Sequence, residues 1–159
     1  MSDAIEIKPA PWEKYAEDIQ AVRRAIFIEE QSVSEEDEWD EYDDHKETQH
    51  LFAFVNDQIC GYTRLLSSGQ IGRVCVYKTF RRQGIASELV RHALIDALSL
   101  NHTSIFLHAQ TSAKALYVDL GFRDDGDVFR EAGIEHQRMT FELDSDTNVE
   151  KLYQDKVIR

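Results

Sequence analysis

Hydrophobic positions recur along this chain with two periods, and each period predicts one type of secondary structure. Apolar side chains spaced three to four residues apart predict amphipathic helices. This spacing covers residues 12–28, 85–100 and 113–120. Short apolar runs bounded by turn residues predict strands, and these runs lie at residues 5–7, 49–56, 58–66, 70–76, 104–109, 128–132 and 137–143. The pattern favours helices packed on a sheet.

Polar and small residues mark the ends of several of these elements. Asn56 and Asp57 separate two strand-like runs and predict a β-hairpin. Ser112 is placed to cap the helix over residues 113–120, and Gly121 suits the C-terminal end of that helix. Residues 144–159 are polar with a weak helical pattern, and we expect them to form an extension or an additional helix.

The composition indicates one folded domain. A chain of 159 residues, 42% of them hydrophobic, can bury one core of ordinary size. No apolar run approaches the length of a membrane span, and the first eleven residues lack the features of a signal peptide. Cys60 and Cys75 provide neither a disulfide framework nor a metal-binding spacing. We expect a cytoplasmic protein.

The charge is strongly acidic and unevenly distributed. A net charge of −12 argues against nucleic acid as a partner and against docking on an anionic membrane. Ten of the sixteen residues from 29 to 44 are Asp or Glu, and none is Lys or Arg. This segment is either a solvated acidic loop or a rim that attracts a cationic amine. The sequence leaves both interpretations open.

A basic turn interrupts this acidic background between the strand at 70–76 and the helix at 85–100. The turn contains Lys78, Arg81, Arg82 and Gly84, and no acidic residue occurs between Arg73 and Ser87. Free backbone N–H groups and the positive end of the helix dipole make a helix N-terminus an anion site. Glycine additionally lets an anion approach the backbone. The turn therefore predicts a site for an anionic ligand.

The spacing of this turn resembles a family signature. Arg81-x-x-Gly84-x-Ala86 is similar to the Arg/Gln-x-x-Gly-x-Gly/Ala motif of the GNAT superfamily of N-acetyltransferases, and it fits neither the dinucleotide-binding fingerprint nor the P-loop. Leu116-Tyr117-x-x-x-Gly121-Phe122 looks like the second landmark of that superfamily. The segments at 27–31, 108–110 and 131–139 resemble the bacterial ElaA-like subgroup, so the resemblance extends over residues 5–143.

The resemblance implies a fold and an activity. The implied fold is a layered α/β (α+β) domain with a mixed central sheet of about six to seven strands, flanked by helices and splayed after the cofactor-binding strand. A single domain would cover residues 1–143, followed by the polar extension at 144–159. The implied activity is acetyl transfer from acetyl-CoA to an amine, by direct attack in a ternary complex and without a metal. Homodimers are common in the superfamily.

The resemblance also implies which residues bind the donor. Backbone groups of the strand at 70–76 would pair with the pantetheine arm, and the basic turn would hold the pyrophosphate. The cofactor-binding residues expected on this basis are Val74, Cys75, Val76, Arg81, Arg82, Gln83, Gly84, Ile85, Ala86, Ser87 and Tyr117. A backbone N–H near Val76 would face the developing oxyanion.

Candidates for the chemical steps follow from the same segments. Tyr117 is the expected general acid for the leaving thiolate, because a phenol stays protonated at neutral pH. Glu30, Glu131 and His136 are alternative general bases. Gln31, His108 and Gln110 are candidates for the acceptor site, although hydrogen bonds inside the fold would explain each of them equally well.

Three further features of the sequence bear on the site. Glu135 stands where the subgroup pattern often has proline, which affects the turn that positions His136. Cys75 alternates with its valine neighbours on a strand, so we expect a buried thiol and not an acetyl-cysteine nucleophile. His45 and His50 flank acidic residues, but their spacing matches no established metal site.

Two other functions remain compatible with the sequence. The chain could be a non-catalytic acyl-CoA-binding sensor that retains the cofactor turn. It could also be an interaction domain on the same fold, with the acidic segment as its docking surface.

Overall fold

The computed structural model describes residues 4–143 and 149–153. In chain order the elements are β1 (Ile5–Pro9), α1 (Trp12–Arg23), the π-helical segment η1 (Arg24–Glu30), α2 (Glu35–Glu38), β2 (Gln49–Val55), β3 (Gln58–Leu65), β4 (Gln70–Val76), the short 3-10 turn η2 (Lys78–Phe80), α3 (Ile85–Ser99), β5 (Phe106–Gln110), the 3-10 turn η3 (Thr111–Ala113), α4 (Lys114–Leu120), β6 (Phe122–Asp124), β7 (Phe129–Glu131) and β8 (Ile134–Phe141). Within these two ranges, no helix has the length and apolar character needed to cross a membrane.

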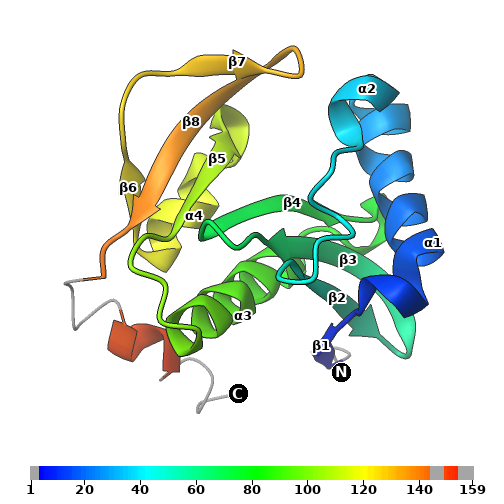
Figure 1. Ribbon diagram of the computed structural model, residues 1–159, viewed down its shortest axis with the longest axis horizontal. Helices are drawn as coiled ribbons and strands as arrows, with labels where there is room; N and C mark the ends of the chain where they lie inside the picture. The colour runs from blue at the N-terminus through cyan, green and yellow to red at the C-terminus, as the bar shows by residue number, and fades with distance from the viewer. Residues whose placement is uncertain (1–3, 144–148, 154–159) are drawn as a thin grey trace.

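The strands of the described residues form one mixed sheet. Its order is β1-β2-β3-β4-β5-β8-β6, and β7 pairs with β8 outside this path. All neighbours are antiparallel except β4 and β5, which run parallel (Figure 1). A parallel pair needs a crossover connection, and α3 provides it. The predicted mixed sheet flanked by helices is confirmed, with β6 as an additional strand that is too short to give a pattern.

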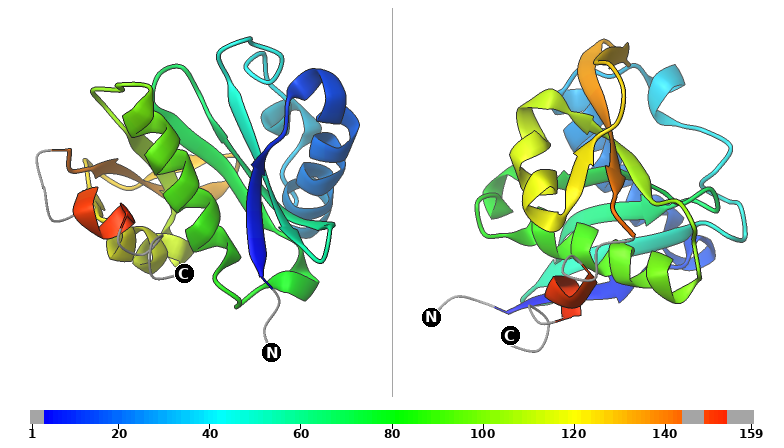
Figure 2. Two further views of the ribbon diagram at one scale, coloured as in Figure 1. Left: turned by 90° about the horizontal axis from the view of Figure 1, so that it is seen from below. Right: turned by 90° about the vertical axis from the view of Figure 1, so that its left-hand side faces the viewer.

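Two hydrophobic cores lie on opposite faces of this sheet. Figure 2 shows α3 on one face and α1 on the other. Leu89, Leu94 and Ile105 belong to the larger core, and Ile19, Val22 and Phe52 belong to the smaller one. All six side chains are fully buried. The apolar faces that the periodicity predicted for the two helices are thus the faces by which α1 and α3 pack on the sheet.

The sheet opens between β4 and β5. These strands pair at Gln70–Phe106 and Ile71–Leu107, and no pairing continues along the rest of β4. On its other side β4 pairs with β3 up to Val76, with a register shift at Thr63. Two residues of β4, one of them Arg73 with a φ of 52°, stand there against one residue of β3. Such a bulge bends a strand, and the predicted splay is confirmed.

Of three predictions made from turn and cap residues, two are confirmed and one is wrong. Asn56 and Asp57 both have positive φ, 50° and 62°, and join β2 to β3 as the predicted hairpin. Gly121 ends α4 in the left-handed conformation with a φ of 107°. The expected Ser112 cap is wrong, because residues Thr111–Ala113 form a 3-10 turn and α4 begins after Ala113 without a side-chain cap.

The first helix is also less regular than its periodicity predicted. The expected helix over 12–28 is α-helical only to Arg23 and continues as the π-helical segment η1 to Glu30. A π-helical turn has one more residue per hydrogen-bonded ring than an α-helical turn. Ile26 and Phe27, adjacent in sequence, are both buried in this segment.

Of the expected extension at 144–159, only residues 149–153 fall within the described part. They are helical, and Leu152 is buried in the larger core. The Arg91 guanidinium donates a hydrogen bond to the Leu152 carbonyl oxygen at 3.2 Å. These residues therefore pack on α3, and the domain boundary at 143 stays a prediction.

Gly61 on β3 provides a test of how closely α3 packs on the sheet. A Cβ at Gly61 would lie 2.8 Å from the Cys75 carbonyl oxygen and 3.1 Å from Leu89 Cδ1. We expect Gly61→Ala to destabilise the fold by about 1–3 kcal/mol, because backbone atoms cannot move aside cheaply. Urea unfolding measures this loss. Gly72→Ala is the matched control, since no atom lies within 4 Å of a Cβ there; equal losses in both variants would contradict the packing argument.

Candidate functional site

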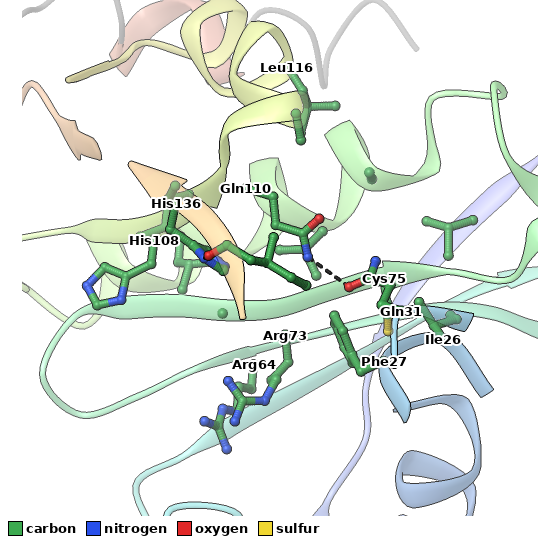
Figure 3. A pocket seen from close by; sticks show the side chains of 18 of the residues that line it. Ile26, Phe27, Gln31, Arg64, Arg73, Cys75, His108, Gln110, Leu116 and His136 are labelled. Carbon is green, nitrogen blue, oxygen red and sulfur yellow. Dashed lines mark hydrogen bonds between the residues drawn. The ribbon is translucent and has the colours of Figure 1, made fainter. Parts of the chain in front are cut away.

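A cavity of about 720 Å³ occupies the opening between β4 and β5. Its walls come from η1, β4, the N-terminal turn of α3, β5, α4 and the β7–β8 hairpin. Figure 3 shows Phe27 on one side of β4 and His108, Gln110 and His136 on the other, with the Gln31 amide in contact with that of Gln110. Most of the residues predicted for the site from sequence line this one cavity: Gln31, Val74, Cys75, Val76, Arg81, Arg82, Gly84, Ile85, Ala86, Ser87, His108, Gln110, Tyr117, Glu131 and His136.

The first turn of α3 closes one end of the cavity. Gly84 is the N-cap of this helix and has a φ of 80°. No atom lies within 4 Å of a Cβ built on Gly84, so the backbone there faces open space. Arg82 also has a positive φ, 64°, and borders the cavity. Gln83, between them, is exposed and does not line the cavity.

Arg81 is engaged in contacts within the fold. Its Nε donates to the Val76 carbonyl oxygen at 3.0 Å, and its two terminal nitrogens donate to the Glu30 carboxylate at 2.6 and 2.7 Å. The Arg81 side chain thus ties the end of β4 to the end of η1. The hydrogen bond from Arg81 holds the pKa of Glu30 below its usual range. Such a carboxylate is a weaker proton acceptor than a free one.

Tyr117 lies on α4 with its ring in the larger core and is 7% exposed. Phe122 packs against the ring edge-to-face, with the centroids 6.1 Å apart. Burial raises the pKa of Tyr117 to about 12. The phenol is therefore protonated at neutral pH, and it borders the cavity.

Cys75 takes no part in a reactive arrangement. Its side chain lies in the smaller core, whereas its neighbours Val74 and Val76 pack toward the larger core. Burial raises the pKa of the Cys75 thiol far above its usual range. A reactive thiolate needs the opposite environment, so the expectation of an inert buried thiol is confirmed.

Two glutamines join the walls of the cavity. Gln110 at the end of β5 donates through Nε2 to Oε1 of Gln31, just after η1, at 2.9 Å (Figure 3). Both residues were predicted as acceptor-site candidates, and their amides contact each other across the cavity. The bond crosses the region where β4 and β5 have separated.

A group of histidine, glutamate and phenylalanine side chains forms another part of the wall. Nδ1 of His108 lies 3.1 Å from Oε2 of Glu131, and this hydrogen bond is the main reason that the pKa of Glu131 is lowered. Phe129 packs edge-on against His108 and is stacked on His136. Nδ1 of His136 lies 2.7 Å from the Ile134 carbonyl oxygen. The structure thus brings His108, Glu131 and His136 together and places Glu30 apart from them, on Arg81.

The acidic segment at 29–44 is neither a fully solvated loop nor a simple rim. Arg23 is fully buried and binds Glu38 at 2.8 Å and Asp43 at 2.6 Å. Arg64 binds Asp43 and Asp40 at 2.8 and 2.6 Å. Sequence reasoning treated these carboxylates as surface charge because their arginine partners lie on other elements.

Arg73 completes this network from the bulge in β4. Its Nε lies 3.1 Å from Glu38 and its Nη2 lies 3.3 Å from Asp40. Arg64, Arg73, Glu38 and Asp40 also line the cavity, and the sequence analysis missed all four. The available signal was an arginine inside each of two apolar strands, since a buried charge requires a partner.

His50 belongs to the same region and is not a metal ligand in this arrangement. Its Nδ1 is 2.5 Å from the Tyr62 hydroxyl and its Nε2 is 2.9 Å from the Asp43 carbonyl oxygen. Burial lowers the pKa of His50. Among the described residues, no group of three His, Cys, Asp or Glu side chains could hold a metal ion.

Comparison with known proteins identifies the family. A model described as the acetyltransferase (GNAT) domain matches residues 15–143. The chain belongs to the GNAT acetyltransferase family. The members of this family transfer acyl groups, and the resemblance seen in the basic turn and in the segment around Tyr117 is confirmed.

Individual GNAT relatives support this assignment. YyaT of Bacillus subtilis (strain 168) is 36% identical over 126 residues, which are 77% of this chain and 85% of that protein. The crystal structure of Escherichia coli ElaA has a TM-score of 0.77 at 25% identity, over 86% of this chain and 99% of that chain. The crystal structure of an acyl-CoA N-acyltransferase from Pseudomonas aeruginosa has a TM-score of 0.75 at 29% identity, over 89% of this chain and 100% of that chain. The similarity to the ElaA-like subgroup is confirmed.

The buried network of this GNAT domain predicts unequal roles for two adjacent arginines. We expect Arg23→Met to destabilise the fold by about 3–5 kcal/mol, because it leaves Glu38 and Asp43 buried with fewer partners. Arg24→Met removes an exposed pair with Glu35, which water and salt screen, and should change the stability far less. Denaturant unfolding at pH 7 compares the two variants, and similar losses would show that the buried network does not hold the acidic segment.

Proposed function

We propose that this protein is an acetyl-CoA-dependent N-acetyltransferase that moves the acetyl group to an amine, by direct attack in a ternary complex. The observation that carries the proposal is the parting of β4 from β5 beside the open N-terminus of α3. Both features border the same cavity. We propose a cytoplasmic location.

The donor would fit this cavity in two ways. Residues 72–76 of β4 lack a partner strand on the β5 side, so their backbone groups can pair with an extended amide-containing chain such as pantetheine. The free N–H groups at the start of α3, together with Arg82, suit the pyrophosphate. Gly84 leaves the space there unfilled. Arg81, which is bonded to Glu30 and to the Val76 carbonyl oxygen, would hold this turn against β4 and η1.

Tyr117 would protonate the leaving thiolate. Its raised pKa keeps the proton on the phenol until a strong base forms beside it. A thiolate that departs into the same apolar surroundings is also more basic than one in water, because burial disfavours its charge. Burial thus raises the pKa of both the phenol and the thiol. The thiolate therefore stays basic enough to take the proton from the phenol.

Donor binding is tested by a single bulky substitution. Gly84→Trp should abolish the micromolar binding of acetyl-CoA that we expect for the unmodified protein, because the indole would occupy the space at the α3 N-terminus. Isothermal titration with acetyl-CoA measures the affinity of the unmodified protein and of the variant. Gly126→Trp is the matched control: Gly126 also has a positive φ, 92°, and open space, and it lies outside the cavity. Absence of binding to the unmodified protein would refute the proposal.

Turnover is tested by the release of CoA thiol with a panel of alkylamines, diamines, aminoglycosides and lysine peptides. With an active acceptor, Tyr117→Phe should lower kcat by roughly 10²–10⁴-fold. Its acetyl-CoA binding should change far less than kcat, because the ring contact with Phe122 is kept. Binding without thiol release from any amine would instead favour a non-catalytic acyl-CoA sensor. Unchanged kcat in Tyr117→Phe would exclude the phenol as the acid.

A further inference from the structure

His136 lines the cavity and keeps one ring nitrogen without a hydrogen-bond partner among the described residues. The residue lies on β8, lines the cavity and is 8% exposed. Its Nδ1 is 2.7 Å from the Ile134 carbonyl oxygen, and a carbonyl oxygen can only accept. The neutral ring therefore carries its hydrogen on Nδ1 and a lone pair on Nε2. Among the described residues, no group hydrogen-bonds to Nε2.

The ring of His136 is held from two sides. Phe129 on β7 is stacked on it, with centroids 5.9 Å apart and an interplanar angle of 24°. Gln110 is its partner in the β5–β8 register, and the Gln110 amide is itself fixed by Gln31. Stacking and the bond to Ile134 fix the direction of Nε2. Figure 3 places His136 on the same side of β4 as Gln110.

The two carboxylates that could also act as the base are both engaged. Glu30 receives two hydrogen bonds from Arg81. Glu131 is bonded to His108, and both carboxylates have lowered pKa values for this reason. A general base needs an accessible lone pair and substantial basicity. Both carboxylates are thus weaker proton acceptors than free ones, whereas Nε2 of His136 has no hydrogen-bond partner among the described residues.

We propose that Nε2 of His136 is the general base that takes the proton from the acceptor amine. This inference rests on the proposed function. The amine nitrogen forms a bond to the thioester carbonyl carbon, and the C–S bond breaks with its electron pair on sulfur. One proton passes from the amine to Nε2, and the sulfur takes a proton from Tyr117. Afterwards His136 returns its proton to water and the phenolate is reprotonated.

The charges around His136 favour this role. Glu131 on β7 interacts electrostatically with His136 and stabilises the imidazolium that forms during the reaction. His108 on β5 is bonded to Glu131, and Arg73 on β4 also interacts with that carboxylate from the opposite side of the cavity. On the strand of His136 itself, Arg138 is paired with Asp125. Glu131 thus supplies the nearby negative charge, and His108 holds that carboxylate in place.

The decisive variant is His136→Asn. The asparagine Nδ2 can keep the donor to the Ile134 carbonyl, and the variant lacks any counterpart of Nε2. With the best amine from the panel, we expect kcat to fall roughly 10²–10⁴-fold. The acidic limb of the pH–rate profile should disappear, while the KM for acetyl-CoA and the melting temperature change little. His102→Gln, which alters a histidine outside the cavity, is the control and should leave all four quantities unchanged.

A second measurement does not depend on turnover. Long-range ¹H–¹⁵N spectra of histidine-labelled protein report which ring nitrogen carries the hydrogen, and His136→Asn assigns the signal. We expect the Nδ1–H tautomer for neutral His136. An Nε2–H tautomer, or a His136→Asn variant that keeps its acidic limb and more than about a tenth of kcat, would overturn the proposal. Absence of acetyl-CoA binding or of thiol release by the unmodified protein would overturn the proposed function and the base together.

Discussion

The structure depends on a constraint of the backbone at β4. Every strand inside a sheet must find partners for N–H and C=O groups on both sides. On the β3 side β4 finds them on both sides of a bulge and as far as Val76, but on the β5 side only at Gln70 and Ile71. The bulge at Arg73 bends the strand at the point where pairing stops. The remaining backbone groups border the cavity, where we propose that the extended arm of the donor binds.

The arginine–carboxylate network fixes the segment that covers one side of this opening. Glu38, Asp40 and Asp43 would repel one another if the segment were merely folded onto the sheet. Arg23, Arg64 and Arg73 come from three different elements and bring an equal number of positive charges. A buried network of this kind contributes little net stability but penalises any other placement of its members. It thereby sets the position of the acidic segment.

The chemistry of the site is decided by which polar atoms are already engaged. Glu30, Glu131 and His136 looked equivalent in sequence, because each is a possible base near a family-like segment. In the structure, Arg81 and His108 bind the two carboxylates, and the Ile134 carbonyl binds only one nitrogen of His136. In the mechanism proposed above, hydrogen-bond partners thus distinguish the base from the two carboxylates.

The sequence by itself determined most of the elements, the basic glycine-containing turn and the family. These depend on local signals: periodicity along α3, the left-handed glycine at Gly84, and the hairpin residues Asn56 and Asp57. Only the tertiary structure decided the partners of the charged residues, the π-helical end of α1 and the strand β6. Glu38 and Arg73 are 35 residues apart in sequence, and their contact forms only when η1, α2 and β4 have packed. Local patterns carry the preferences of a segment, whereas the environment of a side chain comes from segments that the fold brings to it.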